Sequence, residues 1–162
     1  MNPFNHFLVS FNVLLILFHK FATIGEIILF SLIFGALLDL DEIFGTLLKR
    51  PEYHLRTLVQ EPFGFILIGI PFGILFAFML KPYYFFLIII PYALHIILDY
   101  MTFHEAKPLL PFSKKTVRTG FIRPIPPTSC YKIKFEGEKG VPESYVLILN
   151  LIVAVTLLLI YF

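Results

Sequence analysis

Charged residues are scarce in this chain: they make up 15% of its 162 residues, whereas hydrophobic residues make up 58%. Soluble domains typically contain about 45–50% apolar and about 25% charged residues. The composition therefore excludes an ordinary soluble domain and indicates that a lipid bilayer is the solvent. The net charge of +2 is too small to suggest nucleic-acid binding, and we expect no nucleic-acid partner.

Cysteine is nearly absent, and a cleavable leader is not evident. The single cysteine, Cys130, allows no internal disulfide, so cysteine usage does not indicate a redox compartment. The first residues lack a basic segment, and no small-residue cleavage site follows the first apolar run. We therefore expect that the first apolar run stays in the mature protein.

Long apolar runs are the most prominent feature of the sequence. A helix needs about 20 residues to cross the hydrocarbon core, because it rises about 1.5 Å per residue. Five runs approach or reach this length, at residues 4–18, 21–40, 62–80, 82–100 and 144–162. The expected fold class is therefore all-α: one polytopic membrane domain over residues 1–162, with about five transmembrane helices.

Lysine and arginine are unevenly distributed between the predicted loops. If all five runs cross the membrane, the N-terminus, segment 41–61 and segment 101–143 share one side and hold 11 of the 13 basic residues. Only Lys20 and Lys81 lie on the other side. Since basic loops stay in the cytoplasm, we expect a multi-pass cell-membrane protein whose N-terminus and large loops are cytoplasmic.

The basic segment 101–143 has a pattern of its own. Tyr131, Ile133 and Phe135 alternate with polar residues, which is the period of a half-buried strand and predicts a short β-hairpin. An ordinary basic loop held near anionic lipid headgroups is the alternative interpretation. The pattern does not choose between the two.

Histidine and aspartate side chains gather at the predicted cytoplasmic ends of the spans. His95 and Asp99 are one helical turn apart, so they lie on the same helix face. Glu26 begins the second run about 20 Å from Asp39 by helical rise, so we expect it at the opposite interface with His19, paired with Lys20 or water. The six residues expected at one depth are His6, Asp39, Asp41, His54, His95 and Asp99.

Such a set of imidazoles and carboxylates suits a divalent cofactor ion, Zn²⁺, Mn²⁺ or Fe²⁺ among them. An ion of this kind supports hydrolysis of an ester or phosphoester near the headgroups, with membrane lipid as a partner and a lipid-like or phosphorylated substrate. The alternative is a non-catalytic membrane protein, in which the polar cluster ties helices together and the basic loop binds a partner or anionic lipid. A transporter is less favoured, because the candidates gather at one face and not at the midplane.

In this order, the residues resemble the membrane-bound metal-dependent hydrolase family, whose bacterial members include a LexA-regulated inner-membrane protein. The resemblance runs from about Asn5 to Phe112. It is carried by His6 in FNHFLVSF, Asp39 and Asp41 in GALLDLD, Arg50 and His54 in KRPEYHL, His95, Asp99 and Thr102 in HIILDYMT, and the PLLPF segment. Lys49 stands where the family has a histidine, Tyr53 where it has threonine, Leu55 where it has serine, and Leu38 where it has proline.

The resemblance implies a reaction type and does not supply a substrate. The metal ligands that we predict are His6, Asp39, Asp41, His95 and Asp99. His54 is predicted to act as a further ligand or as a general base. Arg50 is predicted to hold an anionic headgroup or phosphate.

Overall fold

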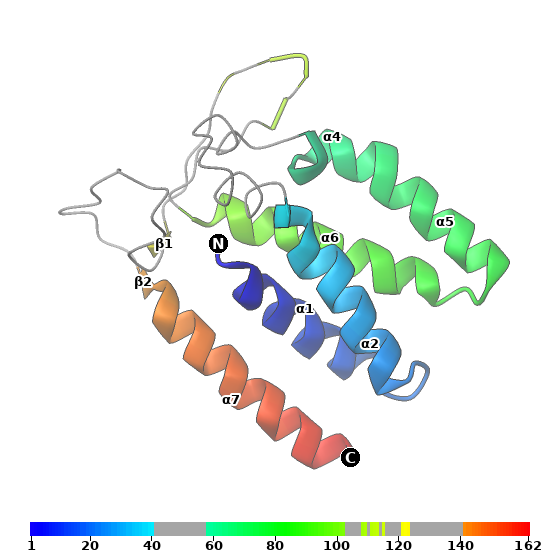
Figure 1. Ribbon diagram of the computed structural model, residues 1–162, viewed down its shortest axis with the longest axis vertical. Helices are drawn as coiled ribbons and strands as arrows, with labels where there is room; N and C mark the ends of the chain where they lie inside the picture. Colours follow the sequence, from blue (N-terminus) through cyan, green and yellow to red (C-terminus); the bar gives the residue numbers. More distant parts are fainter. Residues whose placement is uncertain (41–57, 103–107, 110, 114, 116–120, 124–140) are drawn as a thin grey trace.

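The computed structural model describes residues 1–40, 58–102, 108–109, 111–113, 115, 121–123 and 141–162 (Figure 1). The described elements are helical except for two strands of two residues each, so the predicted all-α class is confirmed. The helical segments are α1 (Pro3–Phe18), α2 (Ile24–Phe30), η1 (Ser31–Ala36), η2 (Leu37–Asp39), η4 (Leu58–Gln60), α4 (Pro62–Gly64), η5 (Phe65–Gly69), α5 (Ile70–Met79), α6 (Tyr84–Tyr100) and α7 (Glu143–Tyr161).

Helix α1 lies at the centre of the bundle and packs against η1, α6 and α7 (Figure 1). It begins where Asn2 accepts a hydrogen bond from the Phe4 amide and Pro3 occupies the first turn, which are favourable start signals. Its apolar side chains form a shared core with residues of α2, α6 and α7. The buried members of this core are Leu8, Phe11, Leu14, Leu15, Ala22, Ile27, Phe30, Leu87, Ile88 and Ala154.

The second apolar run is not a uniform helix from its first residue. It becomes helical only at Ile24, because Thr23 and Glu26 form a reciprocal capping box. It then changes to a π-helix in η1 and a 3₁₀ turn in η2. Glu26 also accepts hydrogen bonds from Tyr83 and Tyr84. Of the two expected partners, Lys20 makes no ion pair with Glu26 in the part of the chain that the structure describes, and water stays a prediction.

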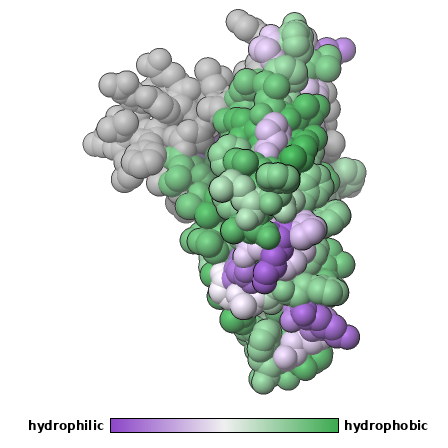
Figure 2. Space-filling view, turned by 90° about the vertical axis from the view of Figure 1, so that its right-hand side faces the viewer, coloured by the Kyte–Doolittle hydropathy of each residue, from purple (hydrophilic) through white to green (hydrophobic). Residues whose placement is uncertain are grey.

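The outer surface of the bundle is apolar. Two segments, Pro62–Met79 and Glu143–Tyr161, are long and apolar enough to cross a membrane, whereas the helices Pro3–Phe18 and Tyr84–Tyr100 are shorter. Only 6% of the apolar window of Glu143–Tyr161 is buried, unlike the core helix of a soluble protein. On the face in Figure 2, apolar side chains cover most of the described surface. Length and composition thus identify two candidate membrane spans, and the other three predicted spans stay predictions.

Four chain segments meet at one end of the bundle. The N-terminus, the end of η2, the end of α6 and the start of α7 lie there, and the C-terminus lies at the other end (Figure 1). Strands β1 (Ile122–Arg123) and β2 (Val141–Pro142) pair in parallel, and Thr102 bridges to Ile122, so α7 is attached beside the end of α6. The predicted hairpin around residues 131–135 lies outside the described residues.

Candidate metal centre

Two buried histidines from different helices face each other at this end of the bundle. His6 comes from the first turn of α1, His95 comes from α6, and both are fully buried. Their rings stack with centroids 4.1 Å apart. Two imidazoles removed from water need polar partners, because burying an unpaired polar group is costly.

Two aspartates lie next to these imidazoles. His95 Nε2 lies 3.2 Å from Asp39 Oδ1 and 3.5 Å from Asp99 Oδ2. His6 Nε2 lies 2.9 Å from Asp99 Oδ1 and 3.8 Å from Asp39 Oδ2. Each carboxylate therefore contacts both histidines, and the four side chains join α1, η2 and α6.

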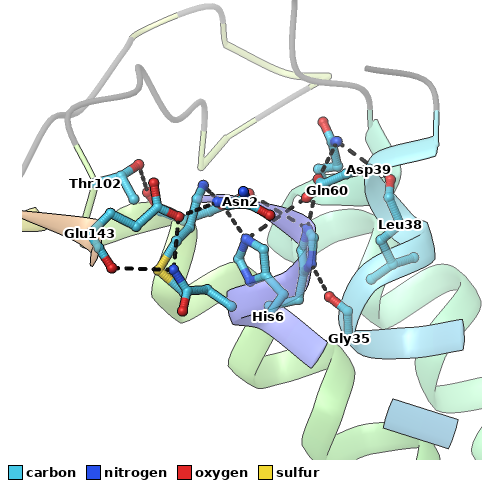
Figure 3. Close-up of polar contacts among 12 residues, drawn as sticks. Asn2, His6, Gly35, Leu38, Asp39, Gln60, Thr102 and Glu143 are labelled. Atoms are coloured by element: carbon cyan, nitrogen blue, oxygen red, sulfur yellow. Dashed lines mark hydrogen bonds and ion pairs between the residues drawn. The ribbon is translucent and has the colours of Figure 1, made fainter. Parts of the chain in front are cut away.

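A backbone carbonyl in η1 sets the orientation of His95. His95 Nδ1 lies 2.8 Å from the carbonyl oxygen of Gly35 (Figure 3). A carbonyl can only accept a hydrogen bond, so Nδ1 carries the proton, and in a neutral imidazole Nε2 is left with its lone pair. Metal-binding histidines are commonly held in this way by their other ring nitrogen.

Three of the four side chains have the spacing of metal ligands. His6, Asp39 and His95 each offer one ligand atom within 4.8 Å of the others, and all three are buried. Donors around a tetrahedral zinc ion, at about 2.0–2.2 Å from it, lie about 3.3–3.6 Å apart, and the 3.2 Å between His95 Nε2 and Asp39 Oδ1 is close to this spacing. Among the described residues, His95 Nε2 and Asp39 Oδ2 make no hydrogen bond. The donor types, the spacing and these two unbonded buried atoms fit a divalent ion such as Zn²⁺.

Asp99 borders this group and has additional partners. Its Oδ1 lies 2.8 Å from the amino group of Met1 as well as near His6. Burial lowers the pKa of the Met1 amino group, but the Asp99 and Asp39 carboxylates outweigh burial and hold this pKa above its ordinary value. Thr102 Oγ1 donates a hydrogen bond of 2.7 Å to the Asp99 carbonyl and closes the end of α6.

Four of the residues singled out from the sequence are thus brought together: His6, Asp39, His95 and Asp99. Their assignment as metal ligands stays a prediction. Asp41, His54 and Arg50 lie outside the described residues, so their predicted roles also stay predictions. His19 lies at the far end of α1 and stacks on Tyr161, with ring centroids 3.9 Å apart.

Sequence reasoning missed three buried polar residues at the same end of the bundle. Gln60 donates to Asp39, Glu61 accepts a hydrogen bond of 2.7 Å from Tyr100, and Glu143 accepts one of 3.0 Å from Asn5. Each lies next to the start of an apolar run on the predicted cytoplasmic side. Glutamate and glutamine residues beside the cytoplasmic ends of the apolar runs are the sequence signal that points to all three.

The comparison with known families agrees with the apolar exterior. The model of the YdjM inner membrane protein family matches residues 1–162. The chain belongs to this family. No curated protein and no solved structure matches it. The YdjM description places the family in the inner membrane and names neither a metal nor a reaction.

Proposed function

We propose that the chain is a metal-dependent hydrolase that cleaves an ester or phosphoester of a membrane-associated substrate at the cytoplasmic interface. One observation carries the proposal: His6, Asp39 and His95 are buried with ligand atoms within 4.8 Å of one another. Three protein ligands and an open position are the pattern of catalytic zinc sites, whereas structural sites use four ligands. The family's membrane location makes a lipid-like substrate the natural class.

In this proposal, His6, Asp39 and His95 would hold the ion, and the chemistry supplied by a bound ion would be an acidified water and a polarised ester or phosphoryl oxygen. Neighbouring groups of the chain determine which ring nitrogen carries a proton. Gly35 keeps the proton of His95 on Nδ1, and Asp99 borders the three residues with its Oδ1 2.9 Å from His6 Nε2. His54 as general base and Arg50 as anion-holding group complete the proposal from the sequence.

Metal analysis of detergent-purified protein tests this function. We expect wild type to retain a divalent ion after dialysis and His95→Ala to lose it, because the substitution removes a nitrogen ligand from a group with three ligands. The measurement is elemental analysis by mass spectrometry. Hydrolysis of p-nitrophenyl esters and phosphates, with and without chelator, is the activity readout.

His19→Ala is the matched control, since this histidine lies at the opposite end of α1 and contacts Tyr161. We expect His19→Ala to keep the metal content and the activity of wild type. Wild type without bound metal, or His95→Ala with an unchanged metal content, would refute the proposal.

A structural role for the cluster is the second candidate, and the hydrogen bond between His6 and Asp99 favours it. This bond of 2.9 Å links α1 to α6 without any ion. In this case His95→Ala lowers the thermal stability of a protein that holds no metal and hydrolyses neither ester nor phosphate. The same purified variants therefore separate the two candidates.

We also propose five transmembrane helices with the N-terminus and the basic segments in the cytoplasm, on the strength of the unequal distribution of lysine and arginine. Cys130, the single cysteine, lies in the basic segment 101–143 and reports its side. We expect a membrane-impermeant maleimide to label Cys130 in permeabilised cells and not in intact cells. Labelling of Cys130 in intact cells would place the basic segment outside the cytoplasm and contradict the proposed orientation.

A further inference from the structure

Gln60 reaches Asp39 from a separate part of the chain. It ends the short turn η4, only 4% of it is exposed, and its Nε2 donates to Asp39 Oδ1 at 3.0 Å and to the Leu38 carbonyl at 3.4 Å (Figure 3). A glutamine amide does not ionise, and its NH₂ group is only a donor. Its contact therefore occupies one oxygen of Asp39 without competing for a cation.

This contact determines which oxygen of Asp39 faces which histidine. Oδ1 receives the Gln60 hydrogen bond and lies 3.2 Å from His95 Nε2, whereas Oδ2 is buried without a hydrogen bond and lies 3.8 Å from His6 Nε2. The terminal torsion of a carboxylate has broad preferences, so the side chain alone does not select this rotation. A donor fixed from outside does select it, and such outer partners commonly orient metal-binding carboxylates.

The turn that carries Gln60 is itself held in place by two further contacts. The Tyr92 hydroxyl donates a hydrogen bond of 2.6 Å to the Val59 carbonyl. Gly64 lies so close to the Leu58 carbonyl that a Cβ atom at position 64 would clash with it. The backbone of η4 is thus held by contacts other than the hydrogen bonds of the Gln60 amide.

We propose that Gln60 is a positioning residue: its amide fixes the rotation of the Asp39 carboxylate so that Oδ1 stays directed at His95 and Oδ2 at His6. This role rests on the proposed metal-dependent function. A simple tie between η4 and η2 is the competing explanation. The two differ in whether losing the amide changes the metal or only the stability.

Titration of metal-stripped protein with Co²⁺ tests the role, because the visible absorption of Co²⁺ reports its ligand geometry. We expect Gln60→Met, which has a similar size and no N–H group, to bind Co²⁺ about 10–100-fold more weakly than wild type and with an altered spectrum. Gln60→Asn, whose shorter amide does not reach Asp39, is the second variant and should behave in the same way.

Tyr92→Phe is the matched control, since it removes a hydrogen bond to the same turn and leaves the Gln60 amide in place. Its Co²⁺ affinity and spectrum should equal those of wild type. An equal loss in Tyr92→Phe, or wild-type affinity and spectrum in either folded Gln60 variant, overturns the positioning role and leaves the proposed function standing. Wild type that binds no Co²⁺ overturns both.

Discussion

Asp39→Asn is expected to abolish the stabilisation of the protein by a divalent ion. Asp39 Oδ1 lies 3.2 Å from His95 Nε2 and Asp39 Oδ2 lies 3.8 Å from His6 Nε2, so the carboxylate is next to both ring nitrogens. Asparagine keeps the shape, but it has no negative charge and turns one of the two oxygens into an NH₂ donor that cannot bind a cation. We expect the metal affinity to fall by more than the about 10–100-fold typical of outer partners.

The thermal transition with and without metal measures this effect. A ligand at 100 times its dissociation constant stabilises the folded state by about 2.7 kcal/mol, provided that it does not bind the unfolded chain. Added Zn²⁺ should therefore raise the Tm of wild type and leave that of Asp39→Asn unchanged.

Glu26→Gln makes the same chemical change at a carboxylate outside the candidate site. It should keep the response of wild type to Zn²⁺, because Glu26 is held by Thr23, Tyr83 and Tyr84 and not by the histidines. An equal rise of the Tm in wild type and Asp39→Asn would contradict the assignment of Asp39 as a ligand. No rise in any variant would favour the structural role of the cluster.

The positions of the helices could be predicted because apolar run length is a local property of the sequence. The run at 82–100 became α6 (Tyr84–Tyr100), and the run at 144–162 became α7 (Glu143–Tyr161). The switch of the second run into π-helix and 3₁₀ turn could not be predicted in this way. It coincides with contacts of Gly35 to Ser10 and His95, which lie far away in the chain.

The sequence predicted the membrane depth of the candidate site, but only part of the arrangement of its side chains. His95 and Asp99 share a helix face by their spacing, and both are buried at the site. That His6 and Asp39 meet this face depends on how α1 and η2 pack, and no local pattern encodes this packing. The contact between Gln60 and Asp39 joins residues 21 positions apart in two irregular turns. Helical periodicity says nothing about such a pair.

Gly35→Ala is expected to separate α1 from η1 and to damage the site at the same time. A Cβ atom at position 35 would lie 2.7 Å from Ser10 Oγ, 3.0 Å from Ser10 Cβ and 3.1 Å from the His6 carbonyl oxygen. Overpacking of a closely packed core typically costs about 1–3 kcal/mol. Because the Gly35 carbonyl also holds His95, a shift of η1 moves both histidines relative to each other. We expect a lower Tm and weaker Co²⁺ binding.

Gly25→Ala is the control for the change from glycine to alanine, since nothing lies within 4 Å of a Cβ at position 25. This variant should be as stable as wild type or more stable by about 0.4–1 kcal/mol, because alanine has fewer unfolded conformations to lose. Wild-type Tm and Co²⁺ affinity in Gly35→Ala would contradict the close packing of α1 on η1.

The double variant Ser10→Gly with Gly35→Ala moves the small residue from η1 to α1. It removes both Ser10 contacts of the new methyl group, while the contact with the His6 carbonyl oxygen remains. If close packing of the two helices aligns His6 with His95, the double variant should recover part of both the Tm and the Co²⁺ affinity. Recovery of the Tm alone would mean that packing stabilises the bundle without setting the distance between the two histidines.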